Sequence, residues 1–252
     1  MATLTILGSG AAVPTIGHDN TYLVIEGEVS TILVDCGGSP LVKLQLAGVD
    51  PTHLGYLVLT HRHPDHLYGY PSLVLGLWLL DCAAPLTVTG EPDAVAGART
   101  LLDVFEPERR WPGFKPPVYQ PVQCRRETVV LDLPDLLITG APTRHMVPSI
   151  GLRLLNKETG TAVVYSSDTG PSEELLRLAR SARILIHEAS GEMEGHSSAA
   201  QAGRAASLSG VERLLLIHYP AHLHNLKDLV AQARREFGGP VELARDMGTV
   251  EF

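Results

Sequence analysis

Short apolar runs, separated by glycine, proline and small polar residues, dominate the first part of the chain. Runs of this length that are bounded by turn-forming residues are typical of strands. A longer amphipathic stretch, residues 92–104, predicts a helix. Strands are expected at residues 3–7, 21–25, 31–35, 54–59 and 86–89, and again at 128–132, 136–140, 150–155 and 161–166.

The pattern changes near residue 171, after which helices and strands alternate. Pro171-Ser172-Glu173-Glu174 opens a helix with acidic residues in its first turn, where the helix dipole favours them. Sheets covered by helices on their outer faces form layered α/β domains. Because no clean linker divides the chain, we predict a single domain over residues 1–252. The later elements expected are strands at 183–187 and 213–218 and helices at 197–208 and 225–237.

Residues 67–80 form the most apolar stretch. It is too short to span a bilayer and is interrupted by Gly69, Pro71 and Gly76. It therefore predicts a buried or amphipathic helix and no membrane partner. Because an exposed apolar patch often marks an interface, a homodimer is expected.

Composition narrows the function classes. The chain has 252 residues and a net charge of −8, which argues against a broad electrostatic footprint for nucleic acid or anionic membrane. A small local basic patch is still compatible with that total. Cys36, Cys82 and Cys124 are scattered and odd in number, so a reducing, cytoplasmic setting is the simpler interpretation.

The densest chemical signal is Thr60-His61-Arg62-His63-Pro64-Asp65-His66, directly after the apolar run at 54–59. A tight loop at the end of a buried strand can direct several imidazoles to one point. Neutral imidazole and carboxylate suit zinc or a similar divalent ion. A surface loop that is merely rich in histidine is the alternative, and the close spacing of four potential ligands argues against it.

Three further candidate ligands each follow a predicted strand. These are His145, Asp168 and His218. A single such residue would usually be part of an ordinary turn. Three of them, together with the loop at 61–66, predict a cluster at one edge of the sheets, where a rigid scaffold holds functional loops.

Residues 106–121 differ from the rest, because five prolines there exclude a regular helix or a central strand. Arg109, Arg110, Trp111, Phe114 and Lys115 gather within this segment. It is either a loop that meets an aromatic or anionic substrate or an ordinary proline-rich surface connection.

Over nearly its whole length the chain resembles the metallo-β-lactamase superfamily, in particular its ribonuclease Z and arylsulfatase-like branch. The opening Leu7-Gly8-Ser9-Gly10, Val34-Asp35-Cys36-Gly37-Gly38 and the loop at 61–66 carry this resemblance, as do His187-Glu188-Ala189-Ser190 and Gly195-His196-Ser197-Ser198. It implies a four-layer αββα sandwich.

The resemblance also implies a site for two divalent metal ions, zinc first and manganese or iron as alternatives. His61, His63 and His145 would hold the first ion, Asp65, His66 and His218 the second, and Asp168 would bridge them. Two such ions can generate a metal-bound hydroxide near neutral pH. Three residues are assigned catalytic roles: Asp65 orients that nucleophile, His196 is the acid, and Glu188 orients His196.

Four of the five other histidines are expected to have no part in catalysis. His187 is predicted to be structural, and His18, His53 and His224 to be ordinary polar residues. The role of His222 is left open.

One departure from the family decides the predicted substrate. Ribonuclease Z carries a tRNA-gripping arm between its third motif and the bridging aspartate, whereas only 22 residues separate His145 from Asp168 here. We therefore expect a hydrolase of small or cyclic phosphodiesters, with a small-molecule ester as its substrate and no long nucleic acid. The alternatives are an arylsulfatase, lactonase or other esterase, a ribonuclease Z-like RNase, and a non-catalytic metal-binding module.

Overall fold

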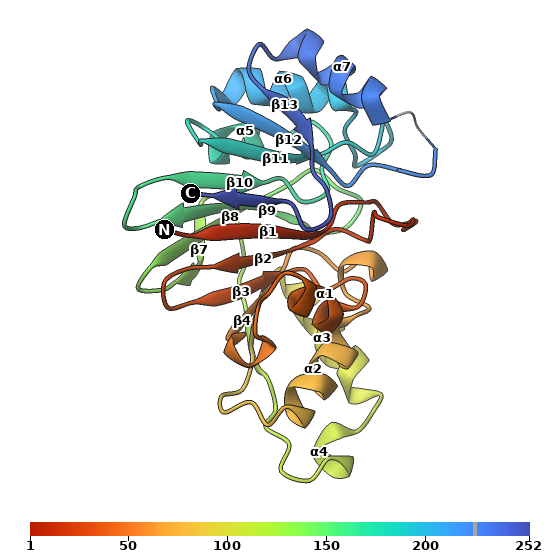
Figure 1. Cartoon of the computed structure of the whole chain (residues 1–252), viewed down its shortest axis with the longest axis vertical. Coiled ribbons are helices and arrows are strands. Elements are labelled where there is room, and N and C mark those ends of the chain that lie inside the picture. The colour runs from red at the N-terminus through yellow and green to blue at the C-terminus, as the bar shows by residue number, and fades with distance from the viewer. Residues whose placement is uncertain (224–225) are drawn as a thin grey trace.

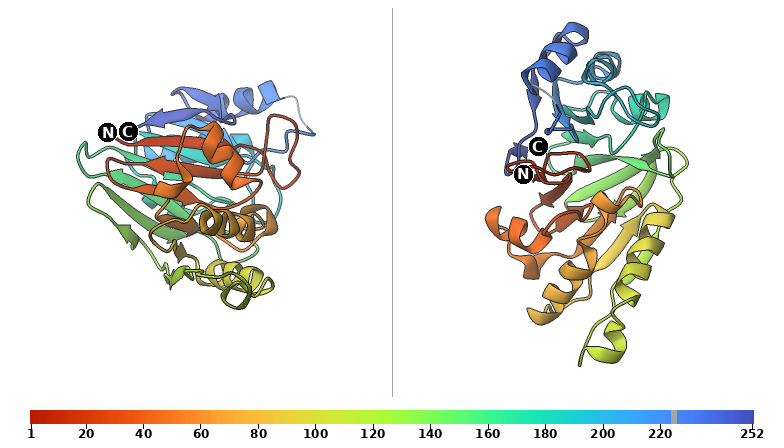
Figure 2. Two further views of the ribbon diagram at one scale, coloured as in Figure 1. Left: turned by 60° about the horizontal axis from the view of Figure 1, so that its bottom comes forward. Right: turned by 90° about the vertical axis from the view of Figure 1, so that its right-hand side faces the viewer.

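A computed structural model describes residues 1–223 and 226–252. Two sheets of seven strands each lie face to face, and helices cover their outer faces (Figures 1 and 2). The strand orders are β14-β1-β2-β3-β4-β5-β6 and β13-β12-β11-β10-β9-β8-β7. The predicted α/β sandwich of four layers is confirmed.

The first sheet is antiparallel at its start and parallel from β3 to β6. Its strands are β1 (Thr3–Gly8), β2 (Tyr22–Glu26), β3 (Thr31–Val34), β4 (Tyr56–Leu59), β5 (Thr87–Gly90), β6 (Val118–Pro121) and β14 (Thr249–Glu251).

The second sheet is antiparallel from β7 to β10 and parallel from β10 to β13. Its strands are β7 (Thr128–Asp132), β8 (Leu136–Pro142), β9 (Ile150–Asn156), β10 (Ala162–Tyr165), β11 (Ile184–Glu188), β12 (Arg213–Ile217) and β13 (Val241–Leu243).

The helices fall into two groups, one for each sheet. The first group is α1 (Pro40–Leu46), α2 (Tyr70–Leu79), α3 (Pro92–Asp103) and α4 (Pro107–Arg110), with the 3₁₀ turns η1 (Pro51–His53) and η2 (Pro64–His66). The second group is α5 (Glu173–Leu178), α6 (Ala199–Ser209) and α7 (Leu226–Glu236). Capping agrees with the sequence: Ser198 and Gln201 form a capping box on α6, and Gly210 ends it at φ 66°.

Three apolar clusters account for the layers. The central cluster takes side chains from both sheets, such as Ile25, Val58, Leu152 and Ile186. The other two fill the spaces between each sheet and its helices. Successive side chains of a strand point to opposite faces of its sheet, so they enter the central cluster and an outer cluster in turn. This alternation fixes the register of both sheets.

Two α-helices and three strands were not expected: α1, α4, β6, β13 and β14. The expectation that prolines exclude a regular helix from residues 106–121 is wrong for α4. Pro107 lies in its first turn, where the missing N–H has no intrahelical partner to lose. β6 lies at the edge of its sheet, where proline is tolerated.

The remaining differences are small shifts of boundaries. The helix expected from residue 67 begins at Tyr70, after the 3₁₀ turn η2 and a short bend. Among the described residues, no helix is long and apolar enough to cross a membrane. His224 and Asn225, respectively an expected polar residue and an expected helix start, lie outside the described residues.

Candidate metal centre

The predicted ligands meet at the ends of the strands that precede them. His61 follows β4, Asp168 follows β10 and His218 follows β12. His145 lies in the loop between β8 and β9, and the bridge between Arg144 and Gly170 fixes that loop. One edge of the two sheets thus gathers side chains that are as many as 157 positions apart in the sequence.

The first group of potential ligands is His61, His63, His145 and Asp168, whose donor atoms all lie within 4.8 Å of one another. His145 Nε2 and His63 Nδ1 are only 3.0 Å apart. Burial, reinforced by the neighbouring imidazoles, holds the pKa of His61 well below its usual value. His61 is therefore neutral and offers a nitrogen lone pair.

The second group is Asp65, His66 and His218. His66 Nε2 lies 3.3 Å from His218 Nε2, and His218 Nε2 lies 3.4 Å from Asp65 Oδ2. Burial alone would lower the pKa of His66, but Asp168, Asp35 and Asp65 outweigh it and raise the pKa to about 10. The carboxylates thus create a field that favours positive charge at this point.

Asp168 lies between the two groups. Its Oδ2 is 3.7 Å from His61 Nε2, and its Oδ1 is 3.6 Å from His66 Nε2. Each oxygen of a fully buried carboxylate therefore faces a different set of imidazoles. This is the arrangement that a bridging ligand requires.

The donor set fits divalent metal ions. Among the described residues, His61 Nε2 and Asp168 Oδ1 are buried polar atoms with no hydrogen-bond partner. Such atoms are rare because an unpaired buried polar group is costly. A cation between these two groups of donor atoms would satisfy both, so the cluster of histidine and aspartate side chains is able to bind metal ions.

Partners behind the cluster set which ring nitrogen faces it. His145 Nδ1 donates to the Gly195 carbonyl at 2.7 Å, and His66 Nδ1 donates to Asp35 Oδ2 at 2.8 Å. The Ser190 hydroxyl donates to the His218 carbonyl and lies 2.9 Å from His218 Nδ1. Each contact engages Nδ1 and turns Nε2 toward the cluster, as in other metal sites.

Asp35, Ser190 and Gly195 were not assigned these roles from the sequence. Asp35 had a visible signal, because it directly follows β3 in a segment that resembles the family. Its φ is +61°, and Ser167 and His218 also adopt positive φ, at 51° each. Three non-glycine residues in the left-handed region of backbone conformation lie beside one cluster. They indicate backbone strain that the surrounding fold stabilises.

His196 and Glu188 form a pair beside the ligands. His196 Nδ1 lies 2.9 Å from Glu188 Oε1. Backbone N–H groups of Thr169 and Ser190 donate to Glu188 at 2.8 and 3.0 Å. Burial alone would lower the pKa of His196, but the hydrogen bond and charge of Glu188 raise it.

His196 also lies within reach of the cluster itself. Its donor atom is within 4.8 Å of donor atoms on Asp168 and His218. A cleft of about 510 Å³ opens beside His145 and His196, and Arg144, Glu192 and Gln201 help to line it. A substrate in this cleft would meet the imidazole of His196 next to the ligands.

The other histidines lie elsewhere. His187 is buried and its Nδ1 donates to the Glu188 carbonyl at 2.8 Å. His18 Nδ1 contacts Ser9 Oγ and the Tyr219 hydroxyl. His53 and His222 are exposed, and none of the four belongs to a described ligand group.

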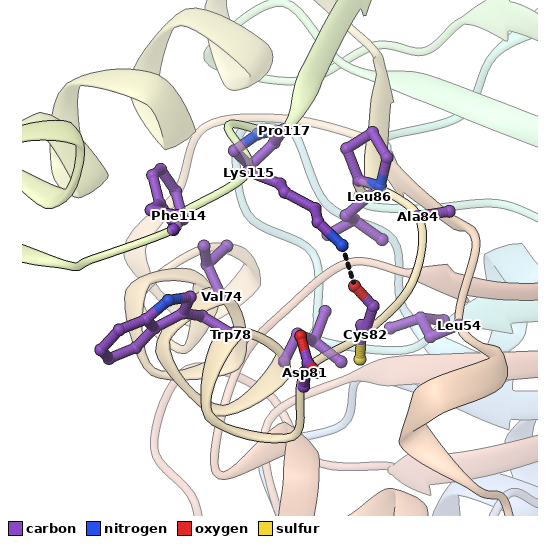
Figure 3. A pocket seen from close by; sticks show the side chains of 13 residues that line it. Leu54, Val74, Trp78, Asp81, Cys82, Ala84, Leu86, Phe114, Lys115 and Pro117 are labelled. Carbon is purple, nitrogen blue, oxygen red and sulfur yellow. Dashed lines mark hydrogen bonds between the residues drawn. The ribbon is translucent and has the colours of Figure 1, made fainter.

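The segment at 106–121 folds against α2. Trp111 stacks on Trp78 with ring centroids 5.2 Å apart. Figure 3 shows the Lys115 side chain extending to the Cys82 carbonyl, with Nζ 3.3 Å from it. Arg109 and Arg110 pair with Glu106. These contacts favour the interpretation of this segment as a surface connection.

The fold and the cluster define a class. The family model of the beta-lactamase superfamily domain matches residues 30–219, so the chain belongs to the metallo-β-lactamase superfamily. Metal-dependent hydrolysis is the chemistry that this membership and the cluster support.

Relatives and solved structures agree with this placement. The chain is 29% identical to a Ribonuclease Z of Mycobacterium marinum, with 100% of this chain and 99% of the relative covered. A Ribonuclease Z of Methanothermobacter thermautotrophicus is 26% identical, with coverage of 100% and 97%. The metallo-beta-lactamase fold protein YhfI from Bacillus subtilis has a TM-score of 0.81, 23% identity and coverage of 100% and 99%. Human tRNase Z, short form, has a TM-score of 0.78, 21% identity and coverage of 99% and 98%.

These names correct one expectation. The prediction of a small-molecule substrate, which excluded long nucleic acids, is wrong. The relatives that match the whole chain are named as ribonucleases. The short β9–β10 hairpin and the charge of −8 led to it. Net charge sums the whole surface, whereas phosphates are bound by a few local cations. The predicted homodimer stays a prediction.

Proposed function

We propose that this protein is a dinuclear metal-dependent phosphodiesterase, with RNA phosphodiesters among its substrates. One observation carries the proposal above the others. Each oxygen of the buried Asp168 faces its own group of imidazoles, at 3.7 Å from His61 and 3.6 Å from His66. That division supports two ions on one shared carboxylate.

The proposed ligands follow from these groups. His61, His63 and His145 would hold one ion, Asp65, His66 and His218 would hold the other, and Asp168 would be shared between them. The many imidazole donors favour zinc, although manganese and iron are compatible. When bound, such ions would supply Lewis-acid polarisation of a phosphoryl group and would lower the pKa of a water ligand.

The chain's own residues complete the reaction. Asp65 orients the attacking water. Burial alone would raise the pKa of the Asp65 carboxyl, but His66 and His218 help to hold this pKa below its usual value. His196 gives a proton to the departing oxygen, since its other ring nitrogen is held by Glu188. Glu188 fixes the tautomer and keeps the imidazole protonated to a higher pH.

We also propose that residues 1–252 act as one domain. Both sheets contribute side chains to the central cluster, and the ligands come from both sheets. Neither sheet alone carries a full set of donors. A fragment that contains only one sheet would therefore lack the site.

A substrate screen tests the proposed reaction. The metal-loaded protein is assayed with bis(p-nitrophenyl) phosphate, a precursor tRNA, a small cyclic phosphodiester, an aryl sulfate, a lactone and a thioester. We expect hydrolysis of the phosphodiesters, the precursor tRNA included, at kcat/KM values well above those for the other esters. Preference for the sulfate or the lactone would replace the phosphodiesterase assignment, and no hydrolysis at all would favour a metal-binding module.

A further inference from the structure

We propose that a cationic groove binds the RNA backbone outside the metal centre. The groove lies where the edge strands β13 and β14 of the two sheets come together. This inference rests on the proposed function, because it names how a long substrate is held. The groove has a volume of about 620 Å³ and runs between β13 and α7 on one side and β14 and β1 on the other. Figure 1 shows β13 and α7 at the end of the molecule where the chain's last third folds.

Four cations line the groove: Arg213, Lys227, Arg234 and Arg245. Among the described residues of its lining, Glu242 is the one carboxylate, and Arg213 pairs with it at 2.8 Å. With Lys227 left aside, the three arginines still outnumber Glu242, so the local balance is positive in a chain whose net charge is −8. Positive side chains gathered in a concave surface raise the local concentration of anions.

Two of these arginines are well placed to receive phosphate. Arg234 donates one N–H to the Val241 carbonyl at 3.2 Å, which orients the guanidinium without cancelling its charge. Arg245 is exposed and lies two residues after the end of β13. A guanidinium has five donors in a planar fork that matches phosphate oxygens.

The floor indicates which part of the RNA is bound. It consists of aliphatic side chains such as Leu215, Val230 and Leu243, and no described lining residue is aromatic. The groove thus offers no platform for base stacking. Contacts to phosphate and sugar, which position the substrate without reading its sequence, are what it can make.

One side of the groove is built on β12, the strand that His218 follows. β13 is parallel to β12, and the Ala244 N–H donates to the Leu216 carbonyl at 2.8 Å. Arg245 and His218 therefore follow neighbouring strands at the same edge of the sheet. Arg213 begins β12 five residues before His218, roughly 16 Å away at about 3.3 Å per residue.

The experiment compares two double variants of the metal-loaded full chain. Arg234→Ala with Arg245→Ala removes two cations from the groove. Arg204→Ala with Arg235→Ala removes two exposed arginines that do not line it, as a matched control. Binding of a labelled single-stranded RNA is followed by anisotropy at several salt concentrations, and hydrolysis of precursor tRNA and of bis(p-nitrophenyl) phosphate is measured in parallel.

We expect the groove variant to bind the labelled RNA about 10-fold more weakly than the control. Its slope of log affinity against log salt should be shallower by about 1.4, since each lost contact to a single strand removes about 0.7. Its kcat/KM for bis(p-nitrophenyl) phosphate should stay within about twofold of the control, because the ester does not reach the groove.

Three results would overturn the groove. One is RNA affinity and a salt slope equal to those of the control variant. Another is an equal loss on RNA and on the small ester, which would place the effect at the metal centre. The third is a wild-type protein that does not bind the RNA. A different result would separate the two proposals. If the wild type binds RNA in a salt-dependent way but does not cleave it, and the groove variant loses this binding, the groove is supported and RNA is rejected as a substrate.

Discussion

Asp168 is the residue on which both halves of the proposed centre depend. Its Oδ1 and Oδ2 face His66 and His61 respectively. Without this carboxylate, two cations would repel each other with no shared anion between them. We expect Asp168→Ala to retain at most one metal per chain and to lose nearly all activity while the fold survives, as measured by metal analysis, circular dichroism and turnover. Two bound metals with normal turnover would contradict the bridging role.

His196 is expected to act on the leaving group. General-acid assistance typically contributes about 10²–10⁴-fold. His196→Ala should keep its metals and slow the hydrolysis of phosphodiesters with alkoxide leaving groups by this amount. A nitrophenolate needs little protonation, so its hydrolysis should fall much less. Equal losses on both kinds of ester, in steady-state assays of one preparation, would indicate a positioning role.

Glu188 sets the pH range in which His196 can be that acid. The Glu188 hydrogen bond and charge outweigh burial and raise the pKa of His196. The protonated acid is therefore present below this raised value and is lost as pH rises through it. In Glu188→Gln the pKa falls, so the basic limb of the kcat profile for a poor leaving group should move to lower pH. An unmoved basic limb would show that another group titrates there.

At the scale of elements, the C-terminal segment after β13 holds the loop between β1 and β2, residues 9–21, against β12. Asp246 accepts from Ser9 N at 3.0 Å, Ser9 Oγ at 2.8 Å, Asp19 N at 3.1 Å and Lys43 Nζ at 2.6 Å. The Ser9 carbonyl in turn accepts from His218 N at 2.9 Å. The backbone of His218, a proposed ligand, is thus held through Ser9, which makes two of these four contacts to Asp246.

Asp246→Ala should therefore weaken both the fold and the second metal site. Hydrogen bonds that involve a charged group contribute about 1.5–3 kcal/mol each at most, and these four share one network. We expect a loss of about 2–4 kcal/mol in the free energy of unfolding, measured with urea, and weaker binding of the second metal equivalent in a titration. Asp228→Ala, an exposed acidic change on α7, is the control. Unfolding and metal affinity equal to this control would reject the link.

The elements also show what the sequence pattern can carry. The buried strands and longer helices were predicted within a few residues, because alternation and capping are local signals. Residues 118–121 and 249–251 were missed because their edge strands have little apolar pattern. α4 was missed because Pro107 was taken as a helix breaker, although it stands at the one position where proline fits.

At the scale of the whole molecule, the sequence placed the seven proposed ligands at strand ends, and the structure brings them together. It did not reveal Asp35, Ser190 or the Gly195 carbonyl as partners, because those contacts depend on packing between distant segments. The net charge of −8 led to the wrong exclusion of a nucleic-acid substrate for a similar reason, because it does not show where the cations lie in the folded chain. Arg213, Arg234 and Arg245 come from separate elements and become a groove only in the folded chain.

The central claim is that two metal ions on this cluster support phosphodiester hydrolysis. Its most direct test is to strip the protein with a chelator, add zinc stepwise, and measure bound metal and bis(p-nitrophenyl) phosphate hydrolysis on the same samples. We predict an inactive apoprotein, saturation at two equivalents per chain, and activity that rises mainly with the second equivalent. Saturation below one equivalent, or hydrolysis that persists in the stripped protein, would contradict the account.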